Sequence, residues 1–571
     1  MSSLPGNSTG AHGWRRLQTR FVSFFQTHRL DVLIAVGLAG FGLVYSFVVL
    51  NPSAHPSEDA AMLMRYAQHL AEGHGIVWNI GEAPVDGATD FLFMAAAAAL
   101  VKAHLSIEHS VRLIGLGSHL LTAMIIYLSL RRGNRLGRLA ATFCVLYFLL
   151  GPGQRYVEAY FGTPFFALFV AVTWYFAIRI SESVEPGPSP ALSLAFALSA
   201  LIMGLIRPEG VILAALMLLS VVYFRGLGAS KRVVVSFLAS FFVLGGLYFV
   251  WRWSYFGYPL PNPFYKKGGG YLYGGSLLMS LRNVRILFGP LLLLPLLGMR
   301  SRQTWRQTVF SLIPIVGFTF IWILLSGEMN YLMRFQYPLL PIALMSWPPL
   351  ASGIWTDFKL PRLQELTRRK RAVAVVVVGV IALAVLREQQ EMYQRAGSGA
   401  DGRYDIAVML NQYADRNYTI ATTEAGLLPF YSAWAALDAW GLNDQWIAHS
   451  GQITSDYLRL HSPEIIMFHG HDYSFNRERA NQPWSRMVQT LHDYANAHGY
   501  RLAAAFGETP RDLHYYYVSP DFPDSEAVIK AIRATPYAWW ASGKQAVNYA
   551  LPLCQTNPHA QESCVFEESH R

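Results

Sequence analysis

Two adjacent carboxylates, Glu58 and Asp59, follow the first long apolar segment of the chain by only a few residues. Ionisable groups at a membrane boundary are costly unless they are hydrated, paired or functional. A carboxylate in a partly apolar site can accept the proton of an attacking hydroxyl, which is the role of a general base. The sequence therefore predicts Asp59 or Glu58 as the base of a group-transfer reaction, with a solvated helix cap as the alternative.

Four basic residues could hold an anionic group near these acids. These residues lie between apolar runs, and we expect them on the same side of the membrane as the acidic pair. They are Arg207, Arg252, Lys267 and Arg334. The positive-inside rule disfavours cations on that side, so topology does not explain them. Arginine and lysine hold a phosphodiester and stabilise a departing phosphate. These four residues are candidates to bind an anionic ligand, with snorkelling or ion pairing, for instance of Arg207 with Glu209, as the alternative.

The composition places these residues in a membrane protein. Of the 571 residues, 53% are hydrophobic and only 14% are charged, whereas about a quarter of the residues of soluble proteins are charged. Spanning helices need about 20 apolar residues, or fewer when flanking residues help. Eleven runs are candidates: Asp31–Leu50, Val111–Leu130, Leu139–Gly151, Phe161–Ile178, Ala191–Ile206, Val211–Phe224, Val233–Trp251, Ile286–Leu297, Val309–Leu325, Tyr337–Ile354 and Ala372–Leu386. The net charge of +10 lies in short clusters between these runs, which favours membrane orientation over nucleic-acid binding.

A further run, Phe91–Leu100, decides the orientation of everything after it. If this run does not cross, four basic clusters share one side with the basic N-terminus: Arg131 to Arg138, Arg225 to Arg232, Arg300 to Arg306 and Lys359 to Arg371. The positive-inside rule requires this arrangement. We therefore expect an interfacial or re-entrant helix at 91–100, a cytoplasmic N-terminus and an external C-terminal part.

The chain then divides into a cytoplasmic segment 1–30, a transmembrane module 31–386 and an external domain 387–571. External loops are expected at 51–110, 251–285 and 326–336. The external domain has a soluble composition and short β-type runs: Tyr418–Thr422, Ile465–Phe468, Tyr500–Phe506 and His514–Val518. The predicted fold class is a polytopic α-helical membrane protein of about eleven transmembrane helices with a C-terminal soluble α/β domain.

Two more acids of the first external loop are candidates for the site. Glu82 and Asp86 lie in a glycine-rich stretch that can fold tightly over the membrane surface and present either acid to a site. Surface acids in turns are common, so a purely structural role is the alternative. A divalent cation at Glu58 and Asp59 also stays open, although no metal or other cofactor is predicted.

The external domain offers weaker signals for metal binding and for a disulfide. His469, His471 and Asp472 could bind a metal, but a polar turn after a β-run is the favoured interpretation. Cys554 and Cys564 could close a small loop in an oxidising compartment, with two unpaired thiols as the alternative. The sequence has no Walker-type phosphate loop and no dinucleotide fingerprint, which weakens ATP-driven transport and nucleotide-sugar chemistry.

The first external loop carries a series of short motifs in a fixed order. After the acidic pair come Arg65-Tyr66-Ala67, Gly73-His74-Gly75, Asn79 with Gly81-Glu82, and Gly87-Ala88-Thr89-Asp90-Phe91-Leu92. This series resembles the first periplasmic loop of the GT-C superfamily of glycosyltransferases. It is most similar to that of the terminal arabinofuranosyltransferases of mycobacterial arabinan assembly and their bacterial homologues.

Later motifs extend this resemblance over nearly the whole chain. They are Arg207-Pro208-Glu209-Gly210, Leu260-Pro261-Asn262 with Phe264-Tyr265-Lys266-Lys267, Gly327-Glu328-Met329 with Arg334-Phe335, and the tail motifs around Gly426 and Asp438. Pro263 replaces the family's threonine, and Glu328 replaces its usual aspartate. The resemblance implies that the donor phosphate is bound by Arg207, Arg252, Lys267 and Arg334. It adds Asn262 and Tyr265 to the expected donor site, and Glu209 and Glu328 as further candidates.

The resemblance implies an inverting glycosyltransferase that uses a polyprenyl-phosphate sugar, with arabinofuranose favoured and hexoses open. The acceptor is expected to be a glycan, a lipid or a protein, on the outer face of a bacterial cytoplasmic membrane. A lipid or glycan transporter is the alternative from another class, although the unusual charges gather in external loops and not at the midplane of repeated bundles. A non-catalytic assembly protein is a third alternative.

Overall fold

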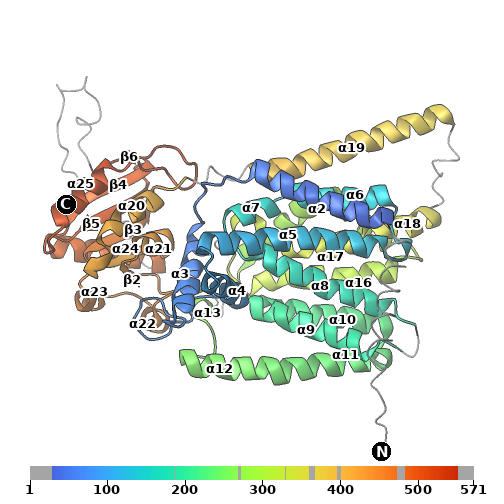
Figure 1. Cartoon of the computed structure of the whole chain (residues 1–571), viewed down its shortest axis with the longest axis horizontal. Helices are drawn as coiled ribbons and strands as arrows, with labels where there is room; N and C mark the ends of the chain where they lie inside the picture. Colours follow the sequence, from blue (N-terminus) through green and yellow to red (C-terminus); the bar gives the residue numbers. More distant parts are fainter. Residues whose placement is uncertain are drawn as a thin grey trace, which may run out of the picture.

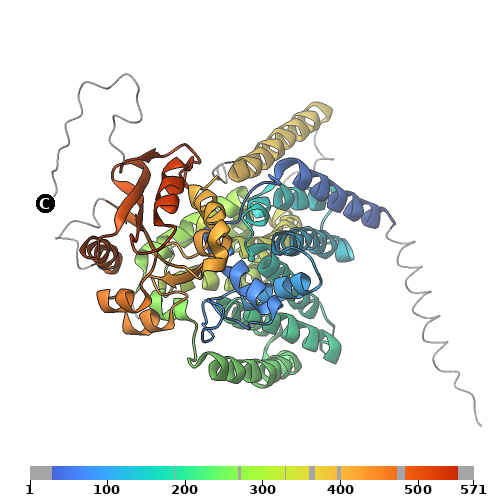
Figure 2. The same cartoon turned by 60° about the vertical axis from the view of Figure 1, so that its left-hand side comes forward.

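The computed structural model describes residues 29–184, 187–267, 272–327, 330–358, 367–394, 400–471 and 482–550. A bundle of helices forms one part, and an α/β domain lies against one end of the bundle (Figures 1 and 2). The bundle helices are α2 (Arg29–Val49), α5 (Ile107–Arg131), α6 (Arg138–Leu150), α8 (Thr163–Ser181), α9 (Pro190–Ile206), α10 (Glu209–Arg225), α11 (Leu227–Ala239), α12 (Gly246–Phe256), α14 (Gly274–Phe288), α15 (Leu293–Gly298), α16 (Trp305–Phe320), α17 (Leu340–Ser346), α18 (Ala351–Asp357) and α19 (Arg368–Gln394).

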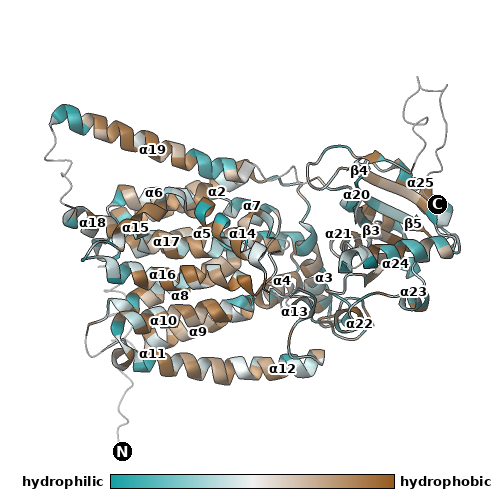
Figure 3. Cartoon of the chain, turned by 180° about the vertical axis from the view of Figure 1, so that it is seen from behind, coloured by the Kyte–Doolittle hydropathy of each residue, from teal (hydrophilic) through white to brown (hydrophobic). Residues whose placement is uncertain are grey.

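Within these described ranges, seven helices are long and apolar enough to cross a membrane. They span Arg29–Val49, Ile107–Asn134, Thr163–Ser181, Leu227–Phe256, Gly274–Gly298, Trp305–Ile323 and Arg368–Met392. The other four expected spans form shorter helices, such as α9 with 17 residues and α6 with 13 residues. Helix α19 is hydrophobic in its middle and hydrophilic at both ends (Figure 3), which is the pattern of a helix that crosses a bilayer.

Two expected boundaries differ from the structure. The helix around Ile286–Leu297 already begins at Gly274, so the expected external loop 251–285 is much shorter. Helix α19 continues to Gln394, eight residues beyond the expected end of the transmembrane module at Leu386. In both cases polar residues extend the apolar run at one end, and hydropathy alone does not detect such extensions.

Close helix packing in the bundle depends on small residues. A Cβ atom at Gly42 of α2 would lie 2.8 Å from the Leu120 side chain of α5, so a larger residue would force that leucine side chain to move. Small residues at helix contacts are typical of membrane bundles, where lipid removes the hydrophobic driving force between helices.

Helices α2 and α6 begin, and α5 ends, at the end of the bundle opposite the α/β domain (Figure 1). Asp31 of α2 accepts from Arg131 at 2.8 Å and from Arg138 at 3.0 Å. Arg306 donates to the Phe224 carbonyl at the end of α10. Arg131 and Arg138 of one basic cluster and Arg306 of another therefore lie at the same end of the bundle. The orientation in the membrane stays a prediction.

Short helices cover the opposite end of the bundle. They are α3 (Glu58–Glu72), α4 (Phe91–Lys102), α7 (Gly153–Glu158) and α13 (Asn262–Lys267). Helix α4 is the run on which the predicted orientation depends, and its 12 residues are too few to span a bilayer. The interfacial placement of α4 stays a prediction.

The α/β domain contains a six-stranded mixed sheet of order β2-β1-β3-β5-β4-β6. Its strands are β1 (Thr419–Thr422), β2 (Ala435–Asp438), β3 (Ile465–His471), β4 (Arg501–Thr509), β5 (Asp512–Val518) and β6 (Val547–Asn548). Strands β2, β1 and β3 run parallel, whereas β5 pairs antiparallel with β3 and β4. Four of the strands correspond to the predicted runs, while β2 and β6 were not predicted.

Both faces of this sheet are covered by helices. Ile465 and Met467 of β3 join the core beneath α20 (Gly402–Leu410) and α25 (Ser525–Ala534). Ile466 and Phe468 join the core beneath α23 (Ser455–His461) and α24 (Pro483–Ala497). Successive side chains of a strand point to opposite faces, so this single apolar run supplies both cores.

Candidate active site

The two adjacent acids open helix α3, and their carboxylates diverge. The Ser57 N–H donates to the Ala159 carbonyl at 3.2 Å, which fixes the start of α3 against the end of α7. Asp59 faces the bundle, where its Oδ2 lies 2.5 Å from Nη2 of Arg334. The Asp59 side chain retains 30% exposure, so it is accessible to a substrate.

Arg334 is held in place by aromatic rings and by an unusual backbone. Its guanidinium lies 4.3 Å from the ring centre of Phe161 and 5.2 Å from that of Phe335. The two residues before it, Leu332 and Met333, adopt positive φ angles of 48° and 66°. Non-glycine residues rarely adopt this conformation, and it concentrates at functional sites. Nε of Arg334 is buried without a hydrogen-bond partner, so one donor of this side chain is available.

A second arginine also lies near the ring of Phe335. The guanidinium of Arg207 is 5.4 Å from the Phe335 ring centre. Its Nε lies 2.8 Å from Glu209 and 3.4 Å from Asp90. Burial raises the pKa of Asp90, and the positive charge of Arg207 opposes that shift. We refer to Asp59, Asp90, Arg207, Glu209 and Arg334 as the acid–arginine cluster.

Glu58 points away from this cluster and into the α/β domain. Its Oε1 accepts hydrogen bonds from the N–H groups of Gly426 and Leu427, which begin α21 (Leu427–Ser432). Its Oε2 lies 3.5 Å from Nη1 of Arg403. Glu58 therefore joins α3 to the α/β domain, while its neighbour faces the bundle.

Arg403 is the centre of a buried network of carboxylates. Its guanidinium lies 2.5 Å from both Asp401 and Glu424, and its own side chain is only 5% exposed. Burial raises the pKa of Glu58 to about 7, against the opposing effect of Arg403. Burial also acts to raise the pKa of Glu424, but Arg403 and His469 lower it below its ordinary value.

These opposite shifts predict how stability depends on pH. A carboxyl whose pKa rises from 4.5 to about 7 on folding binds a proton more tightly in the folded state. Its contribution to stability is complete below pH 4.5 and is lost as the pH rises through about 7. Glu424, with a lowered pKa, contributes above its unfolded pKa and loses this contribution only at lower pH.

We therefore expect Glu58→Gln to flatten the fall in stability that accompanies the rise from pH 4.5 to 7. Thermal unfolding of the detergent-solubilised full chain over this range measures the effect. Glu526→Gln, at an exposed side chain, is the matched control and should retain the slope of the unaltered protein. An identical slope in Glu58→Gln would contradict the assignment.

Arg252 has a different partner from the other predicted phosphate ligands. It forms a two-pronged pair with Asp86, with N–O distances of 2.6 and 2.7 Å, and both side chains are buried. The Asn262 N–H donates to the Asp86 carbonyl at 3.0 Å. Bidentate pairing occupies the face of a guanidinium that a phosphate would use. The structure thus places Arg252, Asp86 and Asn262 in a connection between the first loop and α12–α13.

Helix α13 contacts the α/β domain through aromatic rings. The ring of Tyr265 lies 4.4 Å from that of His449, which also stacks on Tyr258 at 3.6 Å. Lys266 donates to the Gly451 carbonyl at 3.0 Å. Tyr265 therefore contacts α22 (Gln445–Ser450) and not the acid–arginine cluster.

The remaining predicted residues lie elsewhere. Glu82 is exposed and accepts a hydrogen bond from Asn79 at 3.0 Å. The side chain of Lys267, together with Glu328, Asp472, Cys554 and Cys564, lies outside the described residues.

Sequence reasoning did not assign roles to Arg65, Asp90, Arg403 and Glu424. Arg65 is buried and donates to the carbonyls of Trp78 and Trp434 at 2.8 and 3.0 Å, so it joins the first loop to the α/β domain. Asp90 lies within the motif Gly87 to Leu92, and this motif could have identified it as a site residue. Arg403 and Glu58 are separated by more than 300 residues, and nothing in the sequence pairs them.

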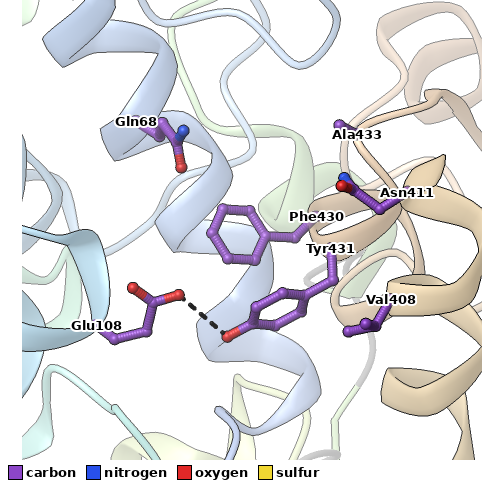
Figure 4. A pocket seen from close by; sticks show the side chains of 7 residues that line it. All are labelled: Gln68, Glu108, Val408, Asn411, Phe430, Tyr431 and Ala433. Carbon is purple, nitrogen blue, oxygen red and sulfur yellow. Dashed lines mark hydrogen bonds between the residues drawn. The ribbon is translucent and has the colours of Figure 1, made fainter. Parts of the chain in front are cut away.

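A pocket of about 320 Å³ lies between the first loop and the α/β domain. Figure 4 shows its lining residues, which come from α3, the start of α5 and the segment from α20 to α21: Gln68, Glu108, Val408, Asn411, Phe430, Tyr431 and Ala433. The Tyr431 hydroxyl donates to Glu108 at 3.5 Å across the pocket. Aromatic rings beside polar groups suit a carbohydrate ligand.

Among the comparisons with known proteins, the one with solved structures identifies the fold. A family model described as a domain of unknown function (DUF8728) matches residues 385–522. No curated protein matches the sequence. ArnT from Cupriavidus metallidurans in the apo state is 17% identical with a TM-score of 0.55, covering 84% of this chain and 97% of ArnT. The chain therefore has the same fold as ArnT.

Two further solved structures have the same fold. ArnT bound to undecaprenyl phosphate is 16% identical with a TM-score of 0.54 and the same coverage. The oligosaccharyltransferase AglB from Archaeoglobus fulgidus, in complex with an inhibitory peptide and a dolichol-phosphate, is 12% identical with a TM-score of 0.54 and covers 87% of this chain and 75% of AglB. The predicted fold class, a polytopic helical membrane protein with a C-terminal α/β domain, is confirmed.

Proposed function

We propose that the chain is an inverting membrane glycosyltransferase that transfers a sugar from a polyprenyl-phosphate donor to a glycan, lipid or protein acceptor. The Asp59–Arg334 pair at the end of the bundle is the observation that carries this proposal. The fold supports it, because solved structures with the same fold hold undecaprenyl phosphate or dolichol-phosphate.

Arg334 and Arg207 are the proposed ligands of the donor phosphate. The acid–arginine cluster contains three carboxylates and two guanidinium groups, so each arginine is already paired with an acid. A phosphodiester competes well for a guanidinium, because charge-assisted bonds to phosphate are strong. Arg334 can accept this new partner through its unpaired Nε, and its pairing with Asp59 then weakens.

Asp59 is the proposed general base. The hydroxyl oxygen of the acceptor attacks the anomeric carbon of the donor, and its proton passes to the Asp59 carboxylate. The bond from the anomeric carbon to the phosphate oxygen breaks, and the polyprenyl phosphate departs with the electron pair. Arg334 and Arg207 stabilise its additional negative charge. Attack from the side opposite the phosphate inverts the anomeric centre.

The pocket of Figure 4 is the proposed binding site for a distant part of the acceptor. Gln68 lies nine residues after Asp59 on α3, which corresponds to about 13 Å along a helix. This distance exceeds the size of one sugar ring, so the pocket suits a unit further along a glycan. Tyr431 and Phe430 can stack on such a unit.

The sugar and the orientation are also proposals. The motif resemblance favours arabinofuranose over hexoses. The gathering of basic residues at the end opposite the α/β domain supports a cytoplasmic N-terminus and an external site in a bacterial membrane.

The test uses the purified full chain and a panel of undecaprenyl-phosphate sugars, including arabinofuranose and mannose, with oligosaccharide acceptors. We expect stoichiometric formation of a glycoside and undecaprenyl phosphate from at least one donor. Transfer of intact donor across liposomes without glycoside would establish a transporter and overturn the proposal.

Binding of undecaprenyl phosphate alone tests the phosphate site separately. We expect Arg334→Gln to weaken it by about tenfold or more, since hydrogen bonds to charged groups contribute about 1.5–3 kcal/mol. Arg416→Gln, at an exposed arginine of the α/β domain, is the control. Equal affinity in both variants would remove Arg334 from the phosphate site.

A further inference from the structure

A second cluster of chemically active side chains lies in the α/β domain and is separate from the acid–arginine cluster. The antiparallel register of β3 and β5 pairs His469 with His514 and His471 with Asp512. Residues two apart on a strand share a face, and paired residues do so as well. These four side chains therefore gather on one face of the sheet, where Glu424 joins them from the segment after β1.

Three members of this cluster form a buried triad. Potential metal-ligand atoms of Glu424, His469 and His514 all lie within 4.8 Å of one another. The exposed fractions of these residues are 9%, 8% and 0%, respectively. Two histidines and one carboxylate are a ligand set that Zn²⁺ uses in proteins, with a fourth position for water.

Each member of the triad has a partner on its other side. His469 Nε2 lies 2.6 Å from Asp512 Oδ1, and His514 Nδ1 lies 2.6 Å from the Tyr537 hydroxyl. Arg403 donates to Oε2 of Glu424. Metal-binding histidines characteristically donate their second ring N–H to a carboxylate or another oxygen, which fixes the ring orientation. This outer set of partners has that arrangement.

The ligand atoms that do not contact these outer partners are the ones that a metal would bind. His514 Nε2 is fully buried and has no hydrogen-bond partner, which is costly for a polar atom in a protein interior. His469 Nδ1 lies 3.7 Å from Glu424 Oε1. Ligands at 2.0–2.1 Å around a tetrahedral zinc ion are about 3.3 Å apart, so this pair is already close to the required separation.

We propose that Glu424 Oε1, His469 Nδ1 and His514 Nε2 bind one zinc ion in the α/β domain. Arg403 connects this site to helix α3, because its guanidinium pairs with both the ligand Glu424 and Glu58 of α3. Zinc at this position therefore supports the junction between the domain and the first loop. All three ligands lie within residues 385–522, the segment matched by the domain of unknown function.

The more exposed group of His469, His471 and Asp512 competes for the same ion. His469 cannot serve both groups with one nitrogen, because Nδ1 faces Glu424 and Nε2 faces Asp512. The unpartnered nitrogen of His514 favours the buried triad.

The test measures zinc in the purified full chain after removal of metal with a chelator, incubation with zinc chloride and desalting. We expect about one zinc ion per chain, and its loss in His514→Gln. His498→Ala, at an exposed histidine of the same domain, and His471→Ala should retain the metal. Tyr537→Phe should weaken zinc binding by about 10–100-fold, because it removes an outer partner of a ligand.

A measurement on the unaltered protein covers the case in which His514→Gln fails to fold. Zinc should raise the unfolding temperature of the chelated protein, and magnesium at the same concentration should not. A protein that takes up no zinc and shows no such shift would overturn the proposal. Retention of zinc by His514→Gln together with its loss in His471→Ala would also overturn it.

Discussion

Replacement of Asp59 with asparagine is expected to lower the rate of sugar transfer by about 10²–10⁴-fold, the usual contribution of a general base. The amide keeps the size of the side chain but cannot accept the proton of the acceptor hydroxyl. Arg334 loses its partner at 2.5 Å, which leaves it free for the donor phosphate. Binding of undecaprenyl phosphate should therefore persist or strengthen while kcat falls, and steady-state kinetics together with a binding assay measure both quantities.

The neighbouring carboxylate provides a sharp comparison. Glu58→Gln removes a charge from the contact with Arg403 but leaves the acid–arginine cluster intact, so its kcat should fall far less. Glu72→Gln, at an exposed acid of the same helix, is the control for a change of charge on α3. If Asp59→Asn retained the activity of this control while Glu58→Gln lost it, the roles of the two acids would be reversed.

Assignment of these roles required the structure. In the sequence Glu58 and Asp59 are equivalent, because both open a helix beside an apolar run. Successive residues of a helix differ by about 100° in direction, so adjacent side chains face different surroundings. What those surroundings contain depends on contacts with residues more than 250 positions away, namely Arg334 for Asp59 and Arg403 for Glu58.

Local patterns predicted most of the fold. Hydropathy identified the apolar helices, and alternating or apolar runs identified β1, β3, β4 and β5. Strand β2 (Ala435–Asp438) is too rich in alanine to give a clear β signal. The register that pairs His469 with His514 is a long-range property. For this reason the sequence favoured a polar turn where the structure contains a possible ligand set.

The four predicted phosphate cations illustrate the same limit. The positions of the basic clusters predicted on which side of the membrane these cations lie. The residues with which they pair could not be predicted from the sequence. Arg252 pairs with Asp86, while Arg207 and Arg334 both lie near Phe335 and pair with acids of the acid–arginine cluster. The charge of a residue and its depth in the membrane can be inferred from the local sequence. Whether that residue forms an ion pair or binds a substrate depends on tertiary contacts.

The second large effect is expected at Arg403, which links the α/β domain to helix α3. Arg403→Gln leaves Asp401, Glu424 and Glu58 close together without their shared cation. Removal of one partner from a buried ion pair costs about 3–5 kcal/mol, because the remaining charge stays desolvated. We expect a large drop in the thermal unfolding temperature and faster proteolysis between α19 and β1. Both are measured with chelator present, so that zinc does not contribute.

Partial recovery of stability in a double variant shows whether the loss in Arg403→Gln comes from unpaired charges or from altered packing. The double variant Arg403→Gln with Glu58→Gln removes one of the unpaired carboxylates and should recover part of the lost stability, as coupled neighbours do. Arg416→Gln should cost less than about 1 kcal/mol, since its pair with Asp524 is exposed. If Arg403→Gln were no less stable than Arg416→Gln, the buried network would not hold the domain to α3. The close approach of Gly426 to Glu58 would then have to fix the contact alone.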